Sequence, residues 1–441
     1  MLCNALYWLP SSGCYLFCWW HGRRNARSLV AKSFNRLFGL WGTDYGCILY
    51  SISLCPVCPP TLGYKVLKLI HSSEDARALA RQRLPWMVFD YFDGSAGNGF
   101  GETRNREVLR DIELSPRSLN NVEHRDLTVS LFDKTLGLPF GVSPMGMCNL
   151  SMPGADLMLA KLAAKNKIPV GVSTAASTSL EKMIEIAEGN AWFQLYFSGN
   201  HEQSDLLIKR AEDSGYDTLI LTVDVPEVGR RPRELRRGFT MPFKIGMQQL
   251  VDFAMHPRWS LTTLVKGRPE LANFGGEFGA FERTASRAGA DWSLLDRIRN
   301  QWKGKLVVKG VLNVFDALKM KESGVDAIQV SSHGGRQLDS GPPAISALKA
   351  IRDAVGPDYP LLYDSGIRSG EDIIKAYAMG ANFVFLGRPL LFAIAARGEH
   401  GLNQMSDVFV KETSIALAQL GVCNMQAIGP ESIGSTETSS V

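Results

Sequence analysis

The stretch Thr218-Leu219-Ile220-Leu221-Thr222-Val223-Asp224 decides the fold, because an almost unbroken apolar run ends there in polar residues. Such runs are typical of parallel strands that are buried on both faces. Seven similar runs, each followed by a longer helical pattern, occupy residues 138–143, 168–173, 192–196, 306–309, 327–331, 361–364 and 383–387. Eight buried strands that alternate with helices predict an α/β fold of the (β/α)8 TIM barrel type.

The alternative fold is a doubly wound open sheet, which places a GxGxxG motif after its first strand. Residues 143–147, Ser-Pro-Met-Gly-Met, do not contain this motif. Two additions to the barrel are expected. A helical pattern runs from the start signal Ser72-Ser73-Glu74-Asp75 to Phe92, which predicts an N-terminal helical segment. The long gap between the fourth and fifth strands predicts an insertion, at residues 240–290.

The composition is that of an ordinary globular protein, with 45% hydrophobic and 21% charged residues in a chain of 441. A formal net charge of +4 without long runs of like charge argues against nucleic acid as a partner. Residues 71–430 are expected to form the barrel domain, in a reducing compartment because they contain few cysteines. Residues 1–70, rich in Cys and Trp, are expected to be an unstructured extension outside the fold, with a membrane anchor as the alternative. Residues 431–441 are expected to be a disordered tail.

The motif Cys55-Pro56-Val57-Cys58 in the extension is a CxxC, which raises the possibility of a zinc or redox site. A zinc site of this kind needs a second CxxC or a histidine pair at a suitable spacing. The sequence has neither, so no metal site is predicted.

Active sites of such barrels lie at the C-terminal ends of the strands. Nearly every predicted strand ends in a hydrogen-bonding or ionisable group, and their convergence on one rim indicates a functional site rather than separate helix caps. In chain order the candidates are Pro144, Met145 and Gly146 after strand one, Ser173 after strand two, Gln194 and Tyr196 on strand three, Thr222 and Asp224 on strand four, Lys309 on strand five, Ser331, His333 and Arg336 after strand six, Asp364, Ser365, Gly366 and Arg368 after strand seven, and Gly387 and Arg388 after strand eight.

The loops after strands seven and eight predict a phosphate site. In barrels of this type these loops present N–H groups and a helix N-terminus to an anion, and Arg368 and Arg388 add positive charge. Lys309 stands inside the rim and needs an anion, for which a negatively charged reduced flavin is one candidate. Gly334 and Gly335 permit a tight bend, so that His333 and Arg336 can address one substrate at two ends.

This set of motifs resembles the FMN-dependent α-hydroxy acid oxidase and dehydrogenase family, from about Ser72 to about Gly429. The motifs occur in the family's order on every strand, and they include Val88–Gly94 and Gly229-Arg230-Arg231. The resemblance implies FMN as the cofactor. By that resemblance, Gln194, Thr222 and Lys309 contact the flavin, Tyr91, Tyr196, Arg231 and Arg336 bind the substrate, and Asp224 holds the catalytic base His333.

The resemblance implies oxidation of an L-2-hydroxy acid of the lactate or mandelate type to the 2-oxo acid. Gly146 stands where the family's oxidases tend to carry alanine and favours a dehydrogenase, whereas Ala175 leaves room for a larger substrate side chain. Ser332 replaces the asparagine that the family usually has. Three alternatives stay open: an oxygen-using 2-hydroxy acid oxidase, another phosphate-binding barrel enzyme such as an isomerase, and an inactive barrel that acts as a membrane-bound interaction module.

The insertion contains the partly amphipathic stretch Met241–Trp259, which suits a membrane surface, an active-site lid or packing on the barrel. Residues 256–261 and 271–274 resemble the loop of the family's membrane-associated bacterial mandelate and L-lactate dehydrogenases, which pass electrons to quinone. The resemblance therefore implies peripheral membrane contact through residues 240–290, quinone or another electron acceptor, and a homotetramer. It places the protein at the cytoplasmic face of the inner membrane or in the cytoplasm.

Overall fold

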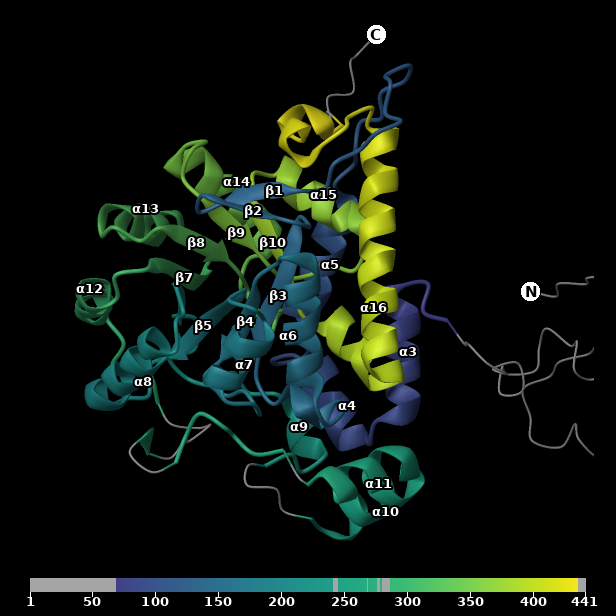
Figure 1. Ribbon diagram of the computed structural model, residues 1–441, viewed down its shortest axis with the longest axis vertical. Coiled ribbons are helices and arrows are strands. Elements are labelled where there is room, and N and C mark those ends of the chain that lie inside the picture. The colour runs from purple at the N-terminus through teal and green to yellow at the C-terminus, as the bar shows by residue number, and fades with distance from the viewer. Residues whose placement is uncertain (1–68, 241–244, 268, 276–277, 280–285, 435–441) are drawn as a thin grey trace, which may run out of the picture. The chain divides into compact units, whose positions relative to one another are not determined.

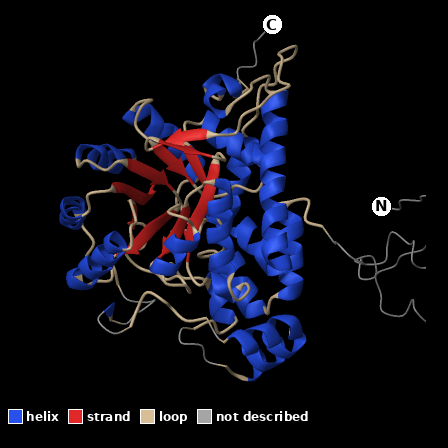
Figure 2. Cartoon of the chain, viewed as in Figure 1, coloured by secondary structure: helices blue, strands red, loops and turns tan. Residues whose placement is uncertain are grey.

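The computed structural model describes residues 69–240, 245–267, 269–275, 278–279 and 286–434. Eight parallel strands form a closed barrel in the order β10-β3-β4-β5-β6-β7-β8-β9 (Figures 1 and 2). They are β3 (Phe140–Met145), β4 (Val170–Ser173), β5 (Ala191–Tyr196), β6 (Thr218–Thr222), β7 (Lys305–Val311), β8 (Ala327–Val330), β9 (Leu361–Tyr363) and β10 (Phe383–Leu386). Each predicted apolar run supplies one strand, so the (β/α)8 prediction is confirmed.

The register of the strands brings the polar ends together. All five residues of β6 are buried, as expected for a strand covered on both faces. Thr222 at its end pairs with Tyr196 of β5 on one side and with Lys309 of β7 on the other. Gln329 of β8 pairs with Lys309 in turn. One rim of the barrel therefore carries the side chains that the sequence singled out.

Helices cover the outside of the barrel because their apolar residues recur every three to four positions. In α14, for example, Ile345, Leu348, Ile351 and Val355 are buried. The helices of the barrel are α6 (Ala155–Asn166), α7 (Leu180–Ile186), α8 (His201–Asp213), α12 (Trp292–Gln301), α13 (Val314–Glu322), α14 (Ala344–Val355), α15 (Gly370–Ala378) and α16 (Arg388–Gln419), the last of which bends at Arg397 and Gly398. Outside it lie α5 (Phe100–Asp111), the hairpin of β1 (Val129–Leu131) and β2 (Lys134–Leu136), and short 3-10 turns at Cys148–Leu150, Met425–Ala427 and Pro430–Ser432.

The predicted N-terminal helical segment is present and consists of two helices. Helix α3 (Ser73–Arg83) begins where expected, with the Ser72 side chain accepting from the Asp75 N–H, and packs against α16 (Figure 1). It ends at Leu84, whose ψ of 142° is extended, and α4 (Trp86–Asp93) begins after Pro85. Proline disfavours a helical conformation in the residue before it and donates no N–H, so the chain turns there.

The insertion after β6 packs on the barrel with its inner side. Helix α9 (Pro232–Arg236) precedes it, and the insertion itself contains α10 (Met247–Met255) and α11 (Pro257–Lys266). The carboxylate of Asp252 on α10 accepts from the N–H groups of Trp86 and Met87, which begin α4. The indole of Trp259 donates to the Leu150 carbonyl at 2.8 Å, and fully buried Asn273 bonds the carbonyl of Ser173 and the N–H of Leu180.

Two of the expected segments lie largely outside the described residues. These are residues 1–68 of the expected extension, including the CxxC motif, and residues 435–441 of the expected tail. Within the described ranges, no helix is long and apolar enough to cross a membrane, and no group of His, Cys, Asp and Glu is arranged to hold a metal ion.

Candidate active site

A cavity of about 220 Å³ opens at the C-terminal ends of the barrel strands. Most of the candidates from the sequence line it: Tyr91, Pro144, Met145, Gly146, Ser173, Tyr196, Arg231, Lys309, His333, Arg336, Asp364, Ser365, Gly366, Arg368, Gly387 and Arg388. Gln194, Thr222, Asp224 and Ser331 are not among the lining residues but form hydrogen bonds at the same rim. The Gln194 amide, for instance, donates to the Thr222 hydroxyl at 2.9 Å.

His333 is held by a carboxylate on one side and faces a phenol on the other. Its Nδ1 lies 3.0 Å and 3.2 Å from the two carboxylate oxygens of Asp224, and its Nε2 lies 3.4 Å from the Tyr196 hydroxyl. Burial lowers the pKa of His333 below its ordinary value, against the opposing effect of Asp224, and the positive charges of Lys309 and Arg231 lower it further. The imidazole is therefore neutral at pH 7, with Nδ1–H donating to Asp224 and Nε2 able to accept a proton.

The backbone at His333 takes a conformation that few non-glycine residues adopt. His333 has a φ of 55°, and Gly334 and Gly335 follow with φ of 63° and 73°. A Cβ atom on Gly335 would lie 2.4 Å from the Glu102 amide nitrogen, so this position requires glycine for close approach as well as for its conformation. A strained backbone at a residue in a pocket is a common feature of functional sites.

Lys309 is a buried cation in the middle of the cavity wall. Its ammonium lies 2.9 Å from the Asp364 carboxylate and donates to the Ser331 hydroxyl at 2.6 Å. Burial by itself would raise the pKa of Asp364, but Lys309 and the hydrogen bonds from Ser331 and Ser365 outweigh burial and lower it. Asp364 is therefore ionised, and the pair fixes the lysine beside the cavity.

Two arginines share one buried carboxylate. Glu234 on α9 accepts from Arg336 Nη2 at 2.9 Å, and its carboxylate lies 3.5 Å from Arg231 Nη1. Nη1 of Arg336 donates to the carbonyls of Tyr91 and Gly94. The hydrogen bonds of Arg336 to the described residues use Nη1 and Nη2, so its Nε–H remains available for another acceptor.

Tyr91 closes the cavity from α4. Its ring stacks on Phe239 at 4.4 Å with an interplanar angle of 6°, and its hydroxyl donates to the Gly146 carbonyl at 3.3 Å. The Arg336 guanidinium carbon lies 5.4 Å from the centre of the same ring. The N-terminal segment thus supplies a phenol to the barrel rim.

The far end of the cavity is strongly basic. Arg368 donates to its neighbour's carbonyl and to Glu102, while Arg388 donates to the carbonyls of Phe92, Gly94 and Gly334. Burial, followed by the charges of Arg336 and Arg368, lowers the pKa of Arg388 to about 9. Such a cluster is stabilised by an added anion.

The residues present fit FMN. Helix α16 starts at Arg388, and Gly366 has a φ of 93° and no room for a side chain, because a Cβ would lie 2.8 Å from the Asn105 carbonyl. A helix N-terminus, a tight glycine loop and two arginines are the donor set of a phosphate site. Lys309 supplies a cation for the ring system.

Three residues of the site were not predicted from the sequence. Glu234 holds both substrate-side arginines, Glu102 pairs with Arg368, and Arg287 lines the cavity with its guanidinium carbon 5.4 Å from the centre of the Tyr196 ring. Burial lowers the pKa of Arg287. Only Glu234 carried a sequence signal, because it follows Arg231 by three residues in the first turn of a helix that Pro232 starts.

The departures from the family pattern have visible consequences. The Ser332 hydroxyl is buried without a hydrogen-bond partner among the described residues, so it does not reproduce the contacts of an amide. A Cβ on Gly146 would lie 3.2 Å from the Ala175 Cβ, which means that two small residues together widen the cavity at this point.

Comparisons with known proteins agree with this site. The profile of the FMN-dependent dehydrogenase family matches residues 80–435. The (S)-mandelate dehydrogenase of Pseudomonas putida is 36% identical over 83% of this chain and 95% of its own length, and the L-lactate dehydrogenase of Pseudomonas syringae pv. syringae (strain B728a) is 34% identical over 82% and 97%. A crystal structure described as the monotopic membrane protein (S)-mandelate dehydrogenase superposes with a TM-score of 0.79 at 35% identity, covering 83% of this chain and 99% of the other. This chain therefore belongs to the family of FMN-dependent dehydrogenases and is an FMN-dependent oxidoreductase.

Proposed function

We propose that the protein oxidises an L-2-hydroxy acid of the lactate or mandelate type to the 2-oxo acid, with residues 71–430 as the catalytic unit. The observation that supports this most is the position of His333, whose Nε2 faces the Tyr196 hydroxyl in the same cavity as Arg336 and Arg231. A neutral base beside two carboxylate-binding groups suits a substrate with an acidic group one carbon away from the reacting C–OH. When bound, FMN supplies the two-electron acceptor.

Residues at different positions in the cavity have different roles in the proposed reaction. Arg336, Arg231 and Tyr91 bind the substrate carboxylate, and the Tyr196 hydroxyl donates to the substrate oxygen. His333 takes a proton at Nε2, and Asp224 stabilises the imidazolium that results. Lys309 stabilises negative charge on the cofactor ring. Pro144, Met145, Gly146, Ser173, Gln194, Thr222, Ser331, Asp364, Ser365, Gly366, Arg368, Gly387 and Arg388 hold the cofactor.

The reaction should depend on pH through His333. Because its pKa is lowered, the neutral form that accepts a proton is present above that pKa and is lost as the pH falls through it. We expect kcat/KM to be constant near pH 7 and to fall tenfold per unit at a pH below about 6.5. In Asp224→Asn this acidic limb should move to lower pH, because Asp224 raises the pKa of His333. An acidic limb that stays in place in the variant would contradict the assignment.

The experiment that tests the function is anaerobic. The purified protein is mixed in turn with L-lactate, L-mandelate and glycolate, and the visible absorbance of FMN is recorded. Bleaching by one acid supports the proposed reaction and identifies the preferred substrate, whereas a bound flavin that none of the three reduces points to another reaction. Subsequent reoxidation by a soluble quinone but not by air favours a dehydrogenase over an oxidase.

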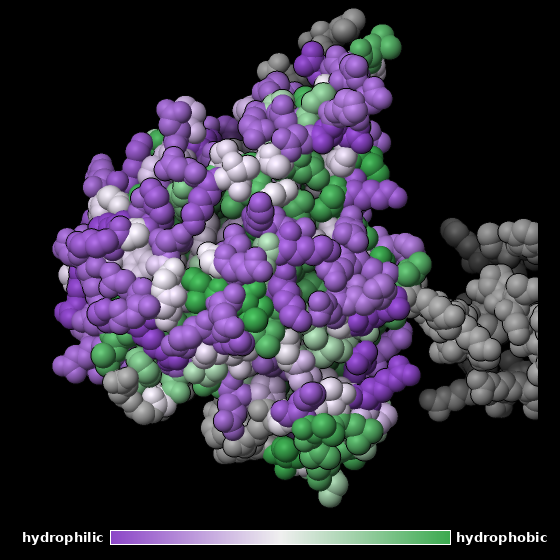
Figure 3. Space-filling model, viewed as in Figure 1, coloured by the Kyte–Doolittle hydropathy of each residue, from purple (hydrophilic) through white to green (hydrophobic). Residues whose placement is uncertain are grey.

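We further propose that quinone is the electron acceptor and that the insertion binds a membrane surface peripherally. The outer sides of α10 and α11, together with Ile245 just before α10, expose a group of large apolar residues: Met247, Leu250, Val251, Met255, Leu261, Leu264 and Val265. They form a continuous hydrophobic region over these helices in Figure 3. Exposed Arg258 and Lys266 lie in the same helices and suit anionic lipid. By family resemblance we propose a homotetramer that lies at the cytoplasmic face of the inner membrane, with the cytoplasm as the alternative location.

Replacing Leu264 and Val265 by glutamate should release the protein from the membrane. Both side chains are 79% exposed, so the change costs little folding stability and removes apolar groups from the lipid. We expect binding to vesicles of mixed neutral and anionic phospholipid, measured by flotation, to fall at least about tenfold, with substrate-driven FMN reduction unchanged. Phe315→Glu on α13, equally exposed at 81%, is the matched control and should bind as the wild type does. Equal loss in the control would contradict the proposed surface.

A further inference from the structure

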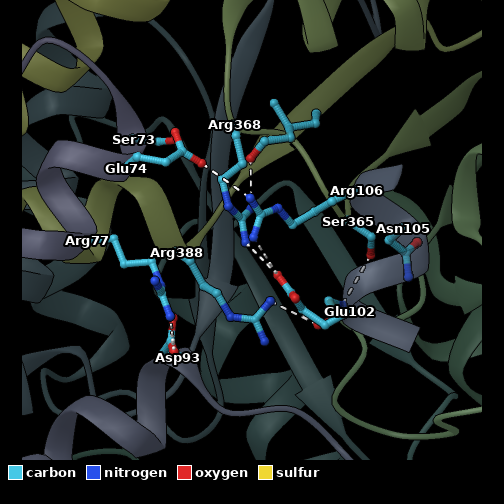
Figure 4. Close-up of polar contacts among 12 residues, drawn as sticks. Ser73, Glu74, Arg77, Asp93, Glu102, Asn105, Arg106, Ser365, Arg368 and Arg388 are labelled. Carbon is cyan, nitrogen blue, oxygen red and sulfur yellow. Dashed lines mark hydrogen bonds and ion pairs between the residues drawn. The ribbon is translucent and has the colours of Figure 1, made fainter. Parts of the chain in front are cut away.

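Glu102, in the first turn of α5, forms an ion pair with Arg368 at the basic end of the cavity. Its Oε1 accepts from Arg368 Nη2 at 3.2 Å (Figure 4). The two side chains are 21% and 14% exposed, so the contact is largely shielded from water. Glu102 approaches this closely because glycine at position 335 leaves room for its backbone.

The charges at this end are unevenly matched. Arg336 is paired with Glu234 and Arg368 with Glu102, whereas the hydrogen bonds of Arg388 to the described residues go to carbonyl oxygens. Asp93 lies nearby but is engaged by Arg77, as Figure 4 shows, and by Arg233. Arg231 shares Glu234 with Arg336, so the four guanidiniums of Arg231, Arg336, Arg368 and Arg388 exceed the two carboxylates by two positive charges. A phosphate monoester carries between one and two negative charges at pH 7.

A phosphate at Arg368 and the carboxylate of Glu102 would be two anions on one guanidinium in a partly dry site. Like charges at such separations repel strongly. Glu102 has a second cation within reach, because Arg106 Nη1 lies 3.8 Å from the same oxygen. Arg106 is itself linked to Glu74, whose carboxylate lies 3.4 Å from its Nη2 and is well exposed.

We propose that the Glu102 carboxylate competes with the FMN phosphate for Arg368. When the phosphate binds, Glu102 breaks its ion pair with Arg368 and pairs with Arg106 instead. Glu102 neutralises the arginine in the cofactor-free protein and weakens cofactor binding, which makes FMN exchangeable. The inference rests on the proposed role of Arg368 and Arg388 in phosphate binding. It concerns the phosphate alone, because Glu102 is not part of the cavity lining that faces the rest of the cofactor.

The test compares FMN with riboflavin, which lacks the phosphate. Flavin is removed from the full-length holoenzyme, and rebinding is followed by quenching of flavin fluorescence. In Glu102→Gln we expect the Kd for FMN to fall about tenfold, with the Kd for riboflavin unchanged. Glu74→Gln removes the same charge without touching Arg368, and its Kd for FMN should stay close to that of the wild type. Unchanged or weaker FMN binding in Glu102→Gln, or an equal change for riboflavin, would overturn the proposal.

Arg106→Met gives a second test of opposite sign. Without Arg106, Glu102 has no alternative partner, so FMN should bind more weakly and riboflavin as before. This weakening should disappear in the Glu102→Gln/Arg106→Met double variant, and its persistence there would show that Arg106 acts on the phosphate directly. Arg368→Met tests separately whether Arg368 binds the FMN phosphate. If this variant weakened FMN and riboflavin binding equally, the assignment of the phosphate site to Arg368 would be wrong. Reduction of bound FMN by a hydroxy acid tests the proposed reaction independently of both.

Discussion

Replacing His333 by glutamine is expected to lower the rate of substrate-driven FMN reduction by about 10³- to 10⁴-fold. Glutamine keeps a side chain of similar length that can hydrogen-bond Asp224, but it offers no basic nitrogen. The 3.0 Å contact with Asp224 and the 3.4 Å contact with Tyr196 fix the position of the imidazole in the cavity. The measurement is the anaerobic decay of FMN absorbance in a rapid-mixing instrument, with a saturating L-2-hydroxy acid.

The flavin content and thermal unfolding midpoint of His333→Gln should match those of the wild type, because no barrel strand contains this residue. Asp224→Asn serves as a graded comparison, since it leaves the imidazole in place and removes only the charge that orients it. A His333→Gln enzyme that binds FMN and bleaches at the wild-type rate would eliminate His333 as the base.

Replacing Arg336 by methionine should chiefly weaken substrate binding, with kcat/KM reduced about 10²- to 10³-fold. Loss of a bidentate, partly buried contact with a carboxylate costs about 3 to 4 kcal/mol, and each 1.4 kcal/mol corresponds to a factor of ten. The substitution also removes one of the two arginines beside buried Glu234 and leaves Arg231 at 3.5 Å. Steady-state kinetics with the L-acid measure the loss.

Arg336→Lys is the matched control, because lysine keeps the positive charge but loses the planar guanidinium. It should recover part of the binding, since lysine provides a cation but not two parallel N–H bonds. The corresponding 2-hydroxy amide gives a sharper control, because a neutral substrate should discriminate little between wild type and variant. An equal loss for acid and amide would mean that Arg336 supports the site through Tyr91, Gly94 and Glu234 and does not bind the carboxylate.

The barrel was predictable because each strand is an apolar run that ends in polar residues, and the observed strand limits lie within a few residues of those runs. The break at Pro85 was missed because the apolar spacing continues in phase through it, although proline is itself a known helix terminator. The packing of the insertion was not predictable. It depends on single contacts such as Asp252 with α4 and Asn273 with β4, which join segments far apart in the chain.

The same distinction applies to the site. Lys309 lies on a strand, and His333, Asp224 and Arg336 follow strands, so the topology of a barrel brings them together. Glu102 and Arg287 lie on elements outside the barrel, and nothing local marks them as neighbours of Arg368 or Tyr196. Their charges alter the electrostatics of the cavity, and only the folded arrangement shows that they are close.

The most direct test of the proposed reaction is a single-turnover comparison of the two enantiomers of one 2-hydroxy acid with the FMN-loaded enzyme in the absence of oxygen. If Arg336 and Arg231 bind the carboxylate while His333 acts from one fixed side, only one enantiomer can present its reacting carbon correctly. We predict rapid loss of FMN absorbance with the L-acid and none with the D-acid on the same timescale. Equal FMN reduction by both enantiomers would contradict the proposed site. So would the absence of FMN reduction by any enantiomer of lactate or mandelate.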